Sequence, residues 1–214
     1  MTCPLCQSTI IQYLGAFSAR RLCRCEECDL VFVNPDYHLT TEQERQRYLL
    51  HRNSLEDQGY LNFLEQLISP FVARLERGST VLDFGSGPKP VMAGLLQARG
   101  YVVKLYDPHF EPDKSVLLNE YDGVTCAETV EHFRFPFEDW QKMAKCVRPA
   151  GLLAVMTMMQ TRETDFANWW YIQDPTHVSF YSNKTFTWIA RQFNLELEIV
   201  TNRVVFFKKK AEPS

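Results

Sequence analysis

The stretch Val81-Leu82-Asp83-Phe84-Gly85-Ser86-Gly87-Pro88 decides the fold of this chain. A short apolar run leads directly into an acidic residue and two closely spaced glycines, and an amphipathic segment over 91–96 follows. This order predicts a strand, a tight turn and a helix, because glycine adopts backbone conformations that other residues avoid. A turn of this kind lets the backbone approach a nucleotide-like ligand at the start of the helix.

A second acidic residue, Asp107, ends the next apolar run, which covers 101–106. A carboxylate at the tip of a second strand accepts hydrogen bonds from both hydroxyls of a ribose. A glycine turn alone is weak evidence for a nucleotide site. The two signals together therefore predict a ligand that contains a ribose.

Strands and helices alternate from about residue 78 to the end of the chain. This alternation predicts an α/β fold with a parallel sheet and helices on both of its faces. The two apolar segments near the end, 195–200 and 204–207, predict closing strands joined by the two-residue connection Asn202-Arg203. The expected strands before them lie near 80–84, 102–106, 122–127 and 151–157.

The cysteines are concentrated at the start of the chain, where five of the seven lie within the first 28 residues. Two C-x2-C pairs, Cys3/Cys6 and Cys25/Cys28, have the spacing that gathers four thiolates tetrahedrally around one Zn²⁺. A unit this small buries too little surface to fold unaided, so the metal would supply folding energy. Cys23 competes with Cys25, but only Cys25 keeps the C-x2-C spacing. We expect a structural zinc ribbon; reduced thiols without metal are the alternative.

The composition bounds the class of protein. The 214 residues, with a net charge of −3, suffice for one substantial domain and a small one, and they give no support for a general nucleic-acid binder. The apolar runs are all shorter than the ~20 residues of a membrane span. The residues after Met1 lack an apolar secretory segment. We therefore expect a cytoplasmic protein without a membrane partner, whose cysteines bind metal or stay reduced.

The segment from 37 to about 77 is predicted to be helical. Thr41-Glu42-Gln43-Glu44 is typical of a capping box, and apolar residues recur at helical spacing between 60 and 75. This segment is either a packing helix with a polar outer face or a lid over the glycine turn.

With these motifs in place, the chain resembles the class I S-adenosylmethionine-dependent methyltransferases, and within them a bacterial subgroup with an N-terminal zinc ribbon. The resemblance covers nearly the whole chain. It rests on the cysteine pairs, the glycine turn and Asp107, and on the segments 127–132, 148–151 and 169–177. It implies a Rossmann-like sheet with helices on both faces. The implied domains are a zinc ribbon over 1–36, a helical connector or lid over 37–77, and an S-adenosylmethionine-binding domain over 78–214.

The resemblance also implies a cofactor site. Asp83, Gly85 and Gly87 would line the methionine end of S-adenosylmethionine, Asp107 would bind the ribose, and Glu128 would border the sulfonium.

One position departs from the family pattern, because Lys89-Pro90 stands where a third glycine is usual. A side chain there would crowd the turn, and a lysine pointing inward would oppose a sulfonium. A dinucleotide oxidoreductase is the competing interpretation of the turn, but such enzymes use the third glycine to let a pyrophosphate approach.

Two histidines have the placement expected of a general base. A hydroxyl or ammonium acceptor must lose a proton, and histidine accepts one near neutral pH. His132 follows the strand predicted near 122–127, and His177 lies in the segment after the strand predicted near 151–157, so both are expected at the edge of the sheet where ligands bind. Glu131 joins them as a catalytic candidate. The remaining histidines are expected at the surface or in packing: His38, His51 and His109.

The same residues allow a second hypothesis. Glu128, Glu131 and His132 stand at i, i+3 and i+4, so a helix would place all three on one side. With His177 they would form a two-carboxylate, two-histidine site for a divalent ion. This set resembles the metal site of the small-RNA 3′-terminal 2′-O-methyltransferases, where the ion would act as a Lewis acid on the acceptor hydroxyl.

Aromatic residues are dense around His177. They would form either the walls of an acceptor pocket or an ordinary core. The cluster consists of Trp169, Trp170, Tyr171, Phe180 and Tyr181.

These observations predict an S-adenosylmethionine-dependent methyltransferase with a structural Zn²⁺, which transfers a methyl group in line to a small-molecule acceptor. Two alternatives remain: an RNA-directed enzyme whose ribbon holds the substrate, and a non-catalytic module whose ribbon docks a partner.

Overall fold

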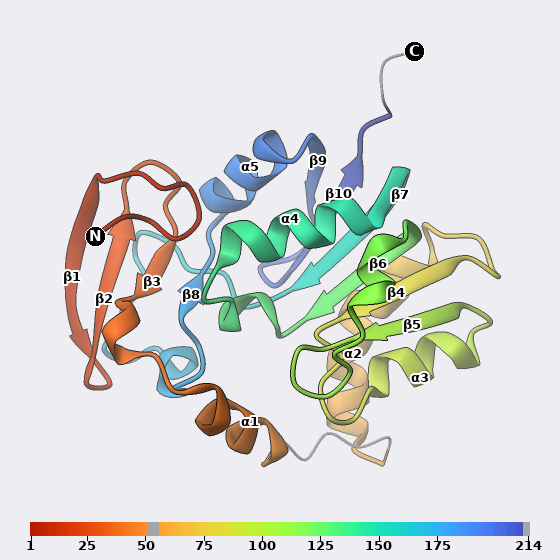
Figure 1. Cartoon of the computed structure of the whole chain (residues 1–214), viewed down its shortest axis with the longest axis horizontal. Coiled ribbons are helices and arrows are strands. Elements are labelled where there is room, and N and C mark those ends of the chain that lie inside the picture. Colours follow the sequence, from red (N-terminus) through yellow and green to blue (C-terminus); the bar gives the residue numbers. More distant parts are fainter. Residues whose placement is uncertain (51–55, 212–214) are drawn as a thin grey trace.

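The computed structural model describes residues 1–50 and 56–211, which form two sheets side by side (Figure 1). The larger sheet has six strands in the order β5-β4-β6-β7-β10-β9. Its strands are β4 (Thr80–Phe84), β5 (Val102–Tyr106), β6 (Tyr121–Ala127), β7 (Val147–Met156), β9 (Leu195–Ile199) and β10 (Val204–Lys209). The four strands predicted near 80, 102, 122 and 151 are all present.

The first four of these strands are parallel, and β4 lies between β5 and β6. Phe84 is paired with Tyr106, and Asp83 is paired with Thr125. The turns after β4, β5 and β6 therefore reach the same edge of the sheet. This register is what brings the glycine turn and Asp107 together.

Helices cover both faces of the large sheet, as predicted (Figure 1). Along β4 the buried side chains alternate: Val81 packs with one pair of helices, while Leu82 packs with the other pair. The first pair is α2 (Gln58–Val72) and α3 (Val91–Ala98), and the second is α4 (Pro136–Cys146) and α5 (Asn183–Gln192). The chain therefore has a Rossmann-like fold.

The closing hairpin differs from the prediction in its turn. β9 and β10 are antiparallel, but four residues, 200–203, separate them rather than two. Thr201 explains the longer connection, because its hydroxyl accepts hydrogen bonds from the N–H groups of Arg203 (3.1 Å) and Val204 (3.0 Å). Backbone hydrogen bonds from the N–H groups of Val200 (2.9 Å) and Thr201 (3.1 Å) to the Val204 carbonyl close the same turn.

The smaller sheet has the order β1-β2-β3-β8. Its first three strands, β1 (Ile11–Phe17), β2 (Arg20–Cys25) and β3 (Val31–Val33), come from the N-terminal region. The fourth, β8 (Ser179–Phe180), comes from the segment that follows His177 and pairs with β3. The N-terminal sheet is thus completed by a strand from the other end of the chain (Figure 1).

Along the chain, α1 (Thr41–Leu49) and α2 lie between the last N-terminal strand, β3, and the first strand of the large sheet, β4. The capping box of α1 lies one residue earlier than predicted, at Thr40 and Gln43 instead of Thr41 and Glu44. Thr40 is the N-cap: its hydroxyl accepts from the Gln43 N–H (3.3 Å), and the Gln43 side chain accepts from the Thr40 N–H (2.8 Å). Glu44 is therefore not part of the capping box, and its side chain forms an ion pair with Arg134 at 2.7 Å. Among the described residues, none of the helices has the length and apolar character to cross a membrane.

Candidate functional site

A cavity of about 1030 Å³ lies at the carboxyl edge of the large sheet. The ends of β4, β5 and β6 form its floor, and α1 and α2 contribute to its walls. The predicted cofactor residues and both predicted histidines line this same cavity. They are Asp83, Gly85, Gly87, Asp107, Glu128, Glu131, His132 and His177.

The two glycines of the turn have different constraints. Gly85 has φ +80°, and a Cβ there would lie 2.2 Å from Thr129 Cγ2. Gly87 has φ +67°, but a Cβ there would meet no atom within 4 Å. Both positions use a left-handed backbone that favours glycine. Gly85 is therefore required by the packing of the protein itself, whereas Gly87 leaves space in the cavity.

Lys89 and Pro90 have different places at the turn. Lys89 is exposed and lines the cavity. Pro90 is the N-cap of α3, which begins at Val91. The cation that departs from the family pattern therefore borders the cavity.

Asp107 fixes the geometry of the turn. It is 7% exposed, and its Oδ2 accepts a hydrogen bond from the Gly87 N–H at 2.9 Å. Its Oδ1 accepts from the N–H groups of His109 (2.8 Å) and Phe110 (3.1 Å). This carboxylate joins the loops after β4 and β5. Oδ1 already accepts two hydrogen bonds, whereas Oδ2 accepts one and keeps a second lone pair.

Two further carboxyl groups in the cavity have raised pKa values. Burial and the charge of Asp107 raise the pKa of Asp83 to about 7. The Thr125 hydroxyl, which donates to Asp83 Oδ1 at 3.0 Å, opposes this rise in pKa. Burial and the charge of Glu131 raise the pKa of Glu128 to about 9. Glu128 Oε1 is buried without a hydrogen-bond partner. A cation in the cavity would relieve the cost of charging both groups.

Glu131 is fully buried, and its carboxylate accepts hydrogen bonds from two hydroxyl groups. Its Oε2 accepts from Thr157 at 3.0 Å, and its Oε1 accepts from the Tyr171 hydroxyl. The segment around it is not the α-helix of the metal hypothesis. Glu128 is left-handed, with φ +48°, and only Val130–His132 forms a short 3-10 helix, η3. Neither Thr157 nor Tyr171 was identified from the sequence as a partner of Glu131.

The two imidazoles that line the cavity lie side by side, with ring centroids 4.8 Å apart. His177 Nδ1 lies 2.7 Å from the Tyr171 carbonyl oxygen, and His132 Nδ1 lies 3.1 Å from that of Thr176. Because a carbonyl only accepts, each Nδ1 carries the hydrogen, and in the neutral ring Nε2 is then the proton acceptor. Burial lowers the pKa of His132 to about 4, so this ring is neutral at pH 7.

Ion pairs neutralise part of the cavity wall. Three of its acidic residues have a basic partner: Glu44 with Arg134 (2.7 Å), Asp174 with Arg47 (2.9 Å) and Asp139 with Lys142 (2.7 Å). Within residues 1–50 and 56–211, the other four acidic residues have no lysine or arginine at ion-pair distance. They are Asp83, Asp107, Glu128 and Glu131. The cavity is therefore suited to a positively charged ligand.

The aromatic cluster is divided between cavity and core. Trp170 and Tyr171 line the cavity, whereas Trp169 and Phe180 pack in the core of the smaller sheet and Tyr181 packs under α4 and α5. Two further aromatic rings of the cavity wall were not identified from the sequence, those of Tyr48 and His109. Tyr48 of α1 lies edge-on to both His132 (5.2 Å) and His109 (5.4 Å). His109, expected at the surface or in packing, thus lines the cavity. His38 instead contacts the Val33 carbonyl at 3.1 Å, and His51 lies outside the described residues.

Two groups of side chains have a metal-binding arrangement. The first is Glu131, His132 and His177, without Glu128. The second consists of Cys3, Cys6, Cys25 and Cys28, whose sulfur atoms all lie within 4.8 Å of one another. Cys23 is buried but is not part of this group.

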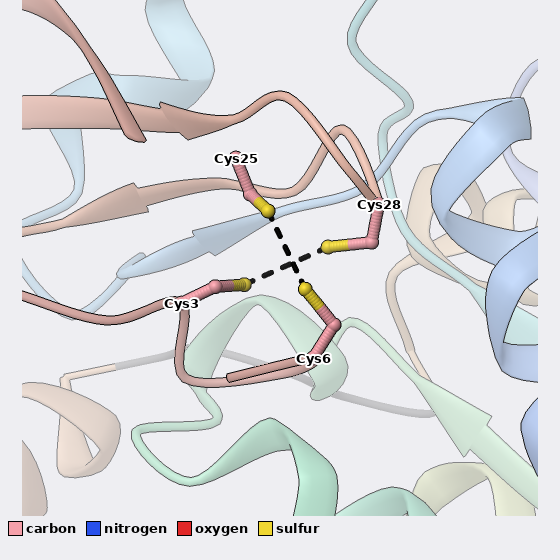
Figure 2. A group of neighbouring side chains, drawn as sticks. All are labelled: Cys3, Cys6, Cys25 and Cys28. Carbon is pink, nitrogen blue, oxygen red and sulfur yellow. Dashed lines mark hydrogen bonds between the residues drawn. The ribbon is translucent and has the colours of Figure 1, made fainter. Parts of the chain in front are cut away.

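The four thiols point to one centre (Figure 2). The Cys3–Cys28 and Cys6–Cys25 sulfur distances are 3.6 and 3.4 Å. A tetrahedron with Zn–S bonds of ~2.3 Å has sulfur–sulfur edges of roughly 3.8 Å, so this arrangement fits the metal. The hydrogen bond from Cys28 lowers the pKa of Cys3 to about 6.

Comparisons of the sequence and the fold with known proteins point to methyltransferases. A family described as "Methyltransferase domain" matches residues 54–200. None of the curated proteins matches the chain. Several solved structures share the fold.

One is the 1,6-didemethyltoxoflavin N1-methyltransferase of Burkholderia thailandensis, with 13% identity, a TM-score of 0.55, and coverage of 94% of this chain and 99% of that one. A second, an O-methyltransferase family protein of the same organism, has 13% identity and a TM-score of 0.54, covering 82% and 62%. A third, a methyltransferase-like protein of Haloferax volcanii solved with the activator Trm112, has 14% identity and a TM-score of 0.52, covering 73% and 94%.

The match of the family to more than half of the chain, on a Rossmann-like sheet with a cavity at its carboxyl edge, leads to one conclusion. This chain belongs to the methyltransferase domain family.

Proposed function

We propose that the chain is an S-adenosylmethionine-dependent methyltransferase that acts on a small-molecule acceptor with a histidine as general base. One observation carries this proposal: a single cavity is lined both by the glycine turn and by the paired imidazoles. Such a cavity holds a methyl donor and an acceptor together, which in-line transfer requires.

The residues present fit the cofactor. The turn at Gly87 leaves room for a ligand, and Oδ2 of Asp107 keeps one lone pair for a ribose hydroxyl. Ser86 Oγ and Glu128 Oε1 are buried without partners and would bind polar groups of a ligand. When bound, S-adenosylmethionine supplies an electrophilic methyl group on a positively charged sulfur. The cavity carboxylates without basic partners stabilise that charge.

The imidazoles remove the acceptor's proton. Each Nδ1 is held by a carbonyl, so Nε2 of His132 or His177 takes the proton as the acceptor oxygen or nitrogen attacks. The buried Glu131 stabilises the imidazolium that results, because opposite charges attract strongly where water is excluded. Trp170 and Tyr171 bound the space for the acceptor.

A small molecule suits this cavity better than RNA. Acidic residues outnumber lysines and arginines in the cavity wall, which disfavours phosphates, and the net charge of −3 gives no general attraction for a polyanion. The toxoflavin-precursor enzyme that shares the fold holds a small acceptor and S-adenosylhomocysteine, which supports the same class here.

We further propose that Cys3, Cys6, Cys25 and Cys28 bind one structural Zn²⁺ in a ribbon at the start of the chain. The ribbon (1–36), connector (37–77) and cofactor domain (78–214) remain the proposed domains. A catalytic role of this metal is disfavoured, because four thiolates leave no open position.

A metal-assisted reaction is the second candidate, favoured by the grouping of Glu131, His132 and His177. Neutral histidines whose Nδ1–H donates to a carbonyl are typical metal ligands. In this version the imidazoles hold a divalent ion instead of taking the proton. Chelation that spares the ribbon zinc separates the two, because only the metal-assisted enzyme then loses turnover.

The proposal is tested with methyl-labelled S-adenosylmethionine and a cell extract divided into small molecules and RNA. We expect label in the small-molecule fraction with the native protein and a strong reduction with His177→Ala. Label in RNA would favour the RNA-directed alternative. Cofactor binding without any labelled product would favour the binding module.

A further inference from the structure

The segment that carries His177 is held from the N-terminal sheet by one arginine. Arg20, the first residue of β2, is only 6% exposed. Its guanidinium donates to the carbonyls of Pro175 (3.1 Å), His177 (2.8 Å) and Asp174 (3.2 Å), and also to that of Ile172. Four carbonyls of one loop thus converge on a single side chain.

Two other carbonyls of the same loop bind the imidazoles. The Tyr171 carbonyl accepts from His177 Nδ1, and the Thr176 carbonyl accepts from His132 Nδ1. The loop therefore has two sets of carbonyls: one set bound to Arg20 and one set bound to the two imidazoles. A shift of the first set moves the second, because both belong to one short stretch of planar peptide units.

The hairpin that carries Arg20 is itself fixed to this loop. Ser18 and Ala19 form its two-residue turn with φ +47° and +59°, values that favour glycine or asparagine. Ser18 Oγ donates to the Gln173 side chain at 3.0 Å. A strained turn of this kind persists where its surroundings hold it. On the far side of the loop, β8 pairs with β3.

We propose that Arg20 is a positioning residue of the active site, which fixes the Nδ1–H tautomer and the orientation of His177 and His132 through the carbonyls of 171–177. The N-terminal sheet is then part of the catalytic machinery. This inference rests on the proposed role of the two imidazoles. A lysine cannot replace Arg20, because a compact ammonium with three donors cannot span four carbonyls as a planar guanidinium does.

The test is Arg20→Lys, with Arg21→Lys as the matched control, because Arg21 is exposed on the same strand. Histidine ring ¹⁵N spectra report the tautomers without any need for turnover. In the native protein and in Arg21→Lys we expect Nδ1–H at both rings. In Arg20→Lys we expect an Nε2–H population at His177, a kcat lowered at least tenfold and a Kd for S-adenosylmethionine within twofold.

Unchanged tautomers in Arg20→Lys, even with lowered thermal stability, would overturn the inference, since a merely structural arginine gives that result. An Nε2–H ring at His177 in the native protein would overturn it as well. If Arg20→Lys does not fold, the native protein still decides. Its four hydrogen bonds should slow the rotation of the Arg20 guanidinium, so that the two Nη atoms give separate NMR signals. A single averaged Nη signal, as expected for the exposed Arg21, would contradict the positioning role of Arg20. Absence of methyl transfer in the native protein would instead count against the proposed function.

Discussion

Substitution of the two turn glycines by alanine separates packing from ligand binding. Gly85→Ala places a Cβ 2.2 Å from Thr129 at φ +80°, whereas Gly87→Ala places one in open space at φ +67°. A left-handed alanine costs ~1–2 kcal/mol. Overpacking adds ~1–3 kcal/mol. We therefore expect a loss of unfolding free energy of about 2–5 kcal/mol for Gly85→Ala and about 1–2 kcal/mol for Gly87→Ala.

For cofactor affinity, Gly87→Ala is the informative variant. The new methyl group of Gly87→Ala occupies cavity space where the ligand meets the turn, so we expect S-adenosylmethionine to bind at least tenfold more weakly, about 1.4 kcal/mol or more. Gly78→Ala is the matched control. Gly78 has φ +86° with no atom within 4 Å of its Cβ, and it does not line the cavity. It should lose the same backbone energy and keep native affinity.

Urea unfolding and calorimetric titration measure the two quantities. Equal destabilisation by Gly85→Ala and Gly87→Ala would refute the steric argument at Thr129. Native affinity in Gly87→Ala would refute the placement of the cofactor against the turn.

Three other sites give further predictions. Asp107→Ala should weaken cofactor binding by ~1–3 kcal/mol in calorimetry, whereas the exposed Asp113→Ala should not; equal affinities would mean that the ribose lies elsewhere. Because Asp83 ionises as pH rises through about 7, the preference for S-adenosylmethionine over uncharged-sulfur S-adenosylhomocysteine should grow between pH 6 and 8. If the sulfonium lowers this pKa by one unit, the preference should grow about fivefold over this range, out of a limiting value of about tenfold, and Asp83→Asn should abolish the pH dependence; a native preference that does not change with pH would contradict the pairing of Asp83 with the sulfonium. Cys25→Ser should release zinc, seen by elemental analysis, and lower the thermal midpoint; retention of one zinc per chain would move the ligand role to Cys23.

The elements that depend on local sequence were predictable. The strand, turn and helix around Gly85 follow from residues within about 15 positions of one another, and Asp107 follows from the next strand. Neighbouring parallel strands then bring these two signals to one edge without further information. Cys3 and Cys28 are likewise grouped by spacing alone.

The contacts that depend on tertiary structure were not predictable. The Thr40 cap is one residue away from the expected one because Glu44 pairs with Arg134, 90 residues later. The aromatic ring of Tyr48 reaches the imidazoles from another helix. Arg20 meets its carbonyls more than 150 residues away. No periodicity or motif records such pairs, because each depends on how the two sheets lie against each other.

Calorimetric titration of the folded, zinc-loaded protein with S-adenosylmethionine, and separately with S-adenosylhomocysteine, shows whether the cavity binds the methyl donor. We expect micromolar binding of both at one site per chain, with competition between them. Binding of neither would contradict it, and the non-catalytic binding module would then be the better description of this chain.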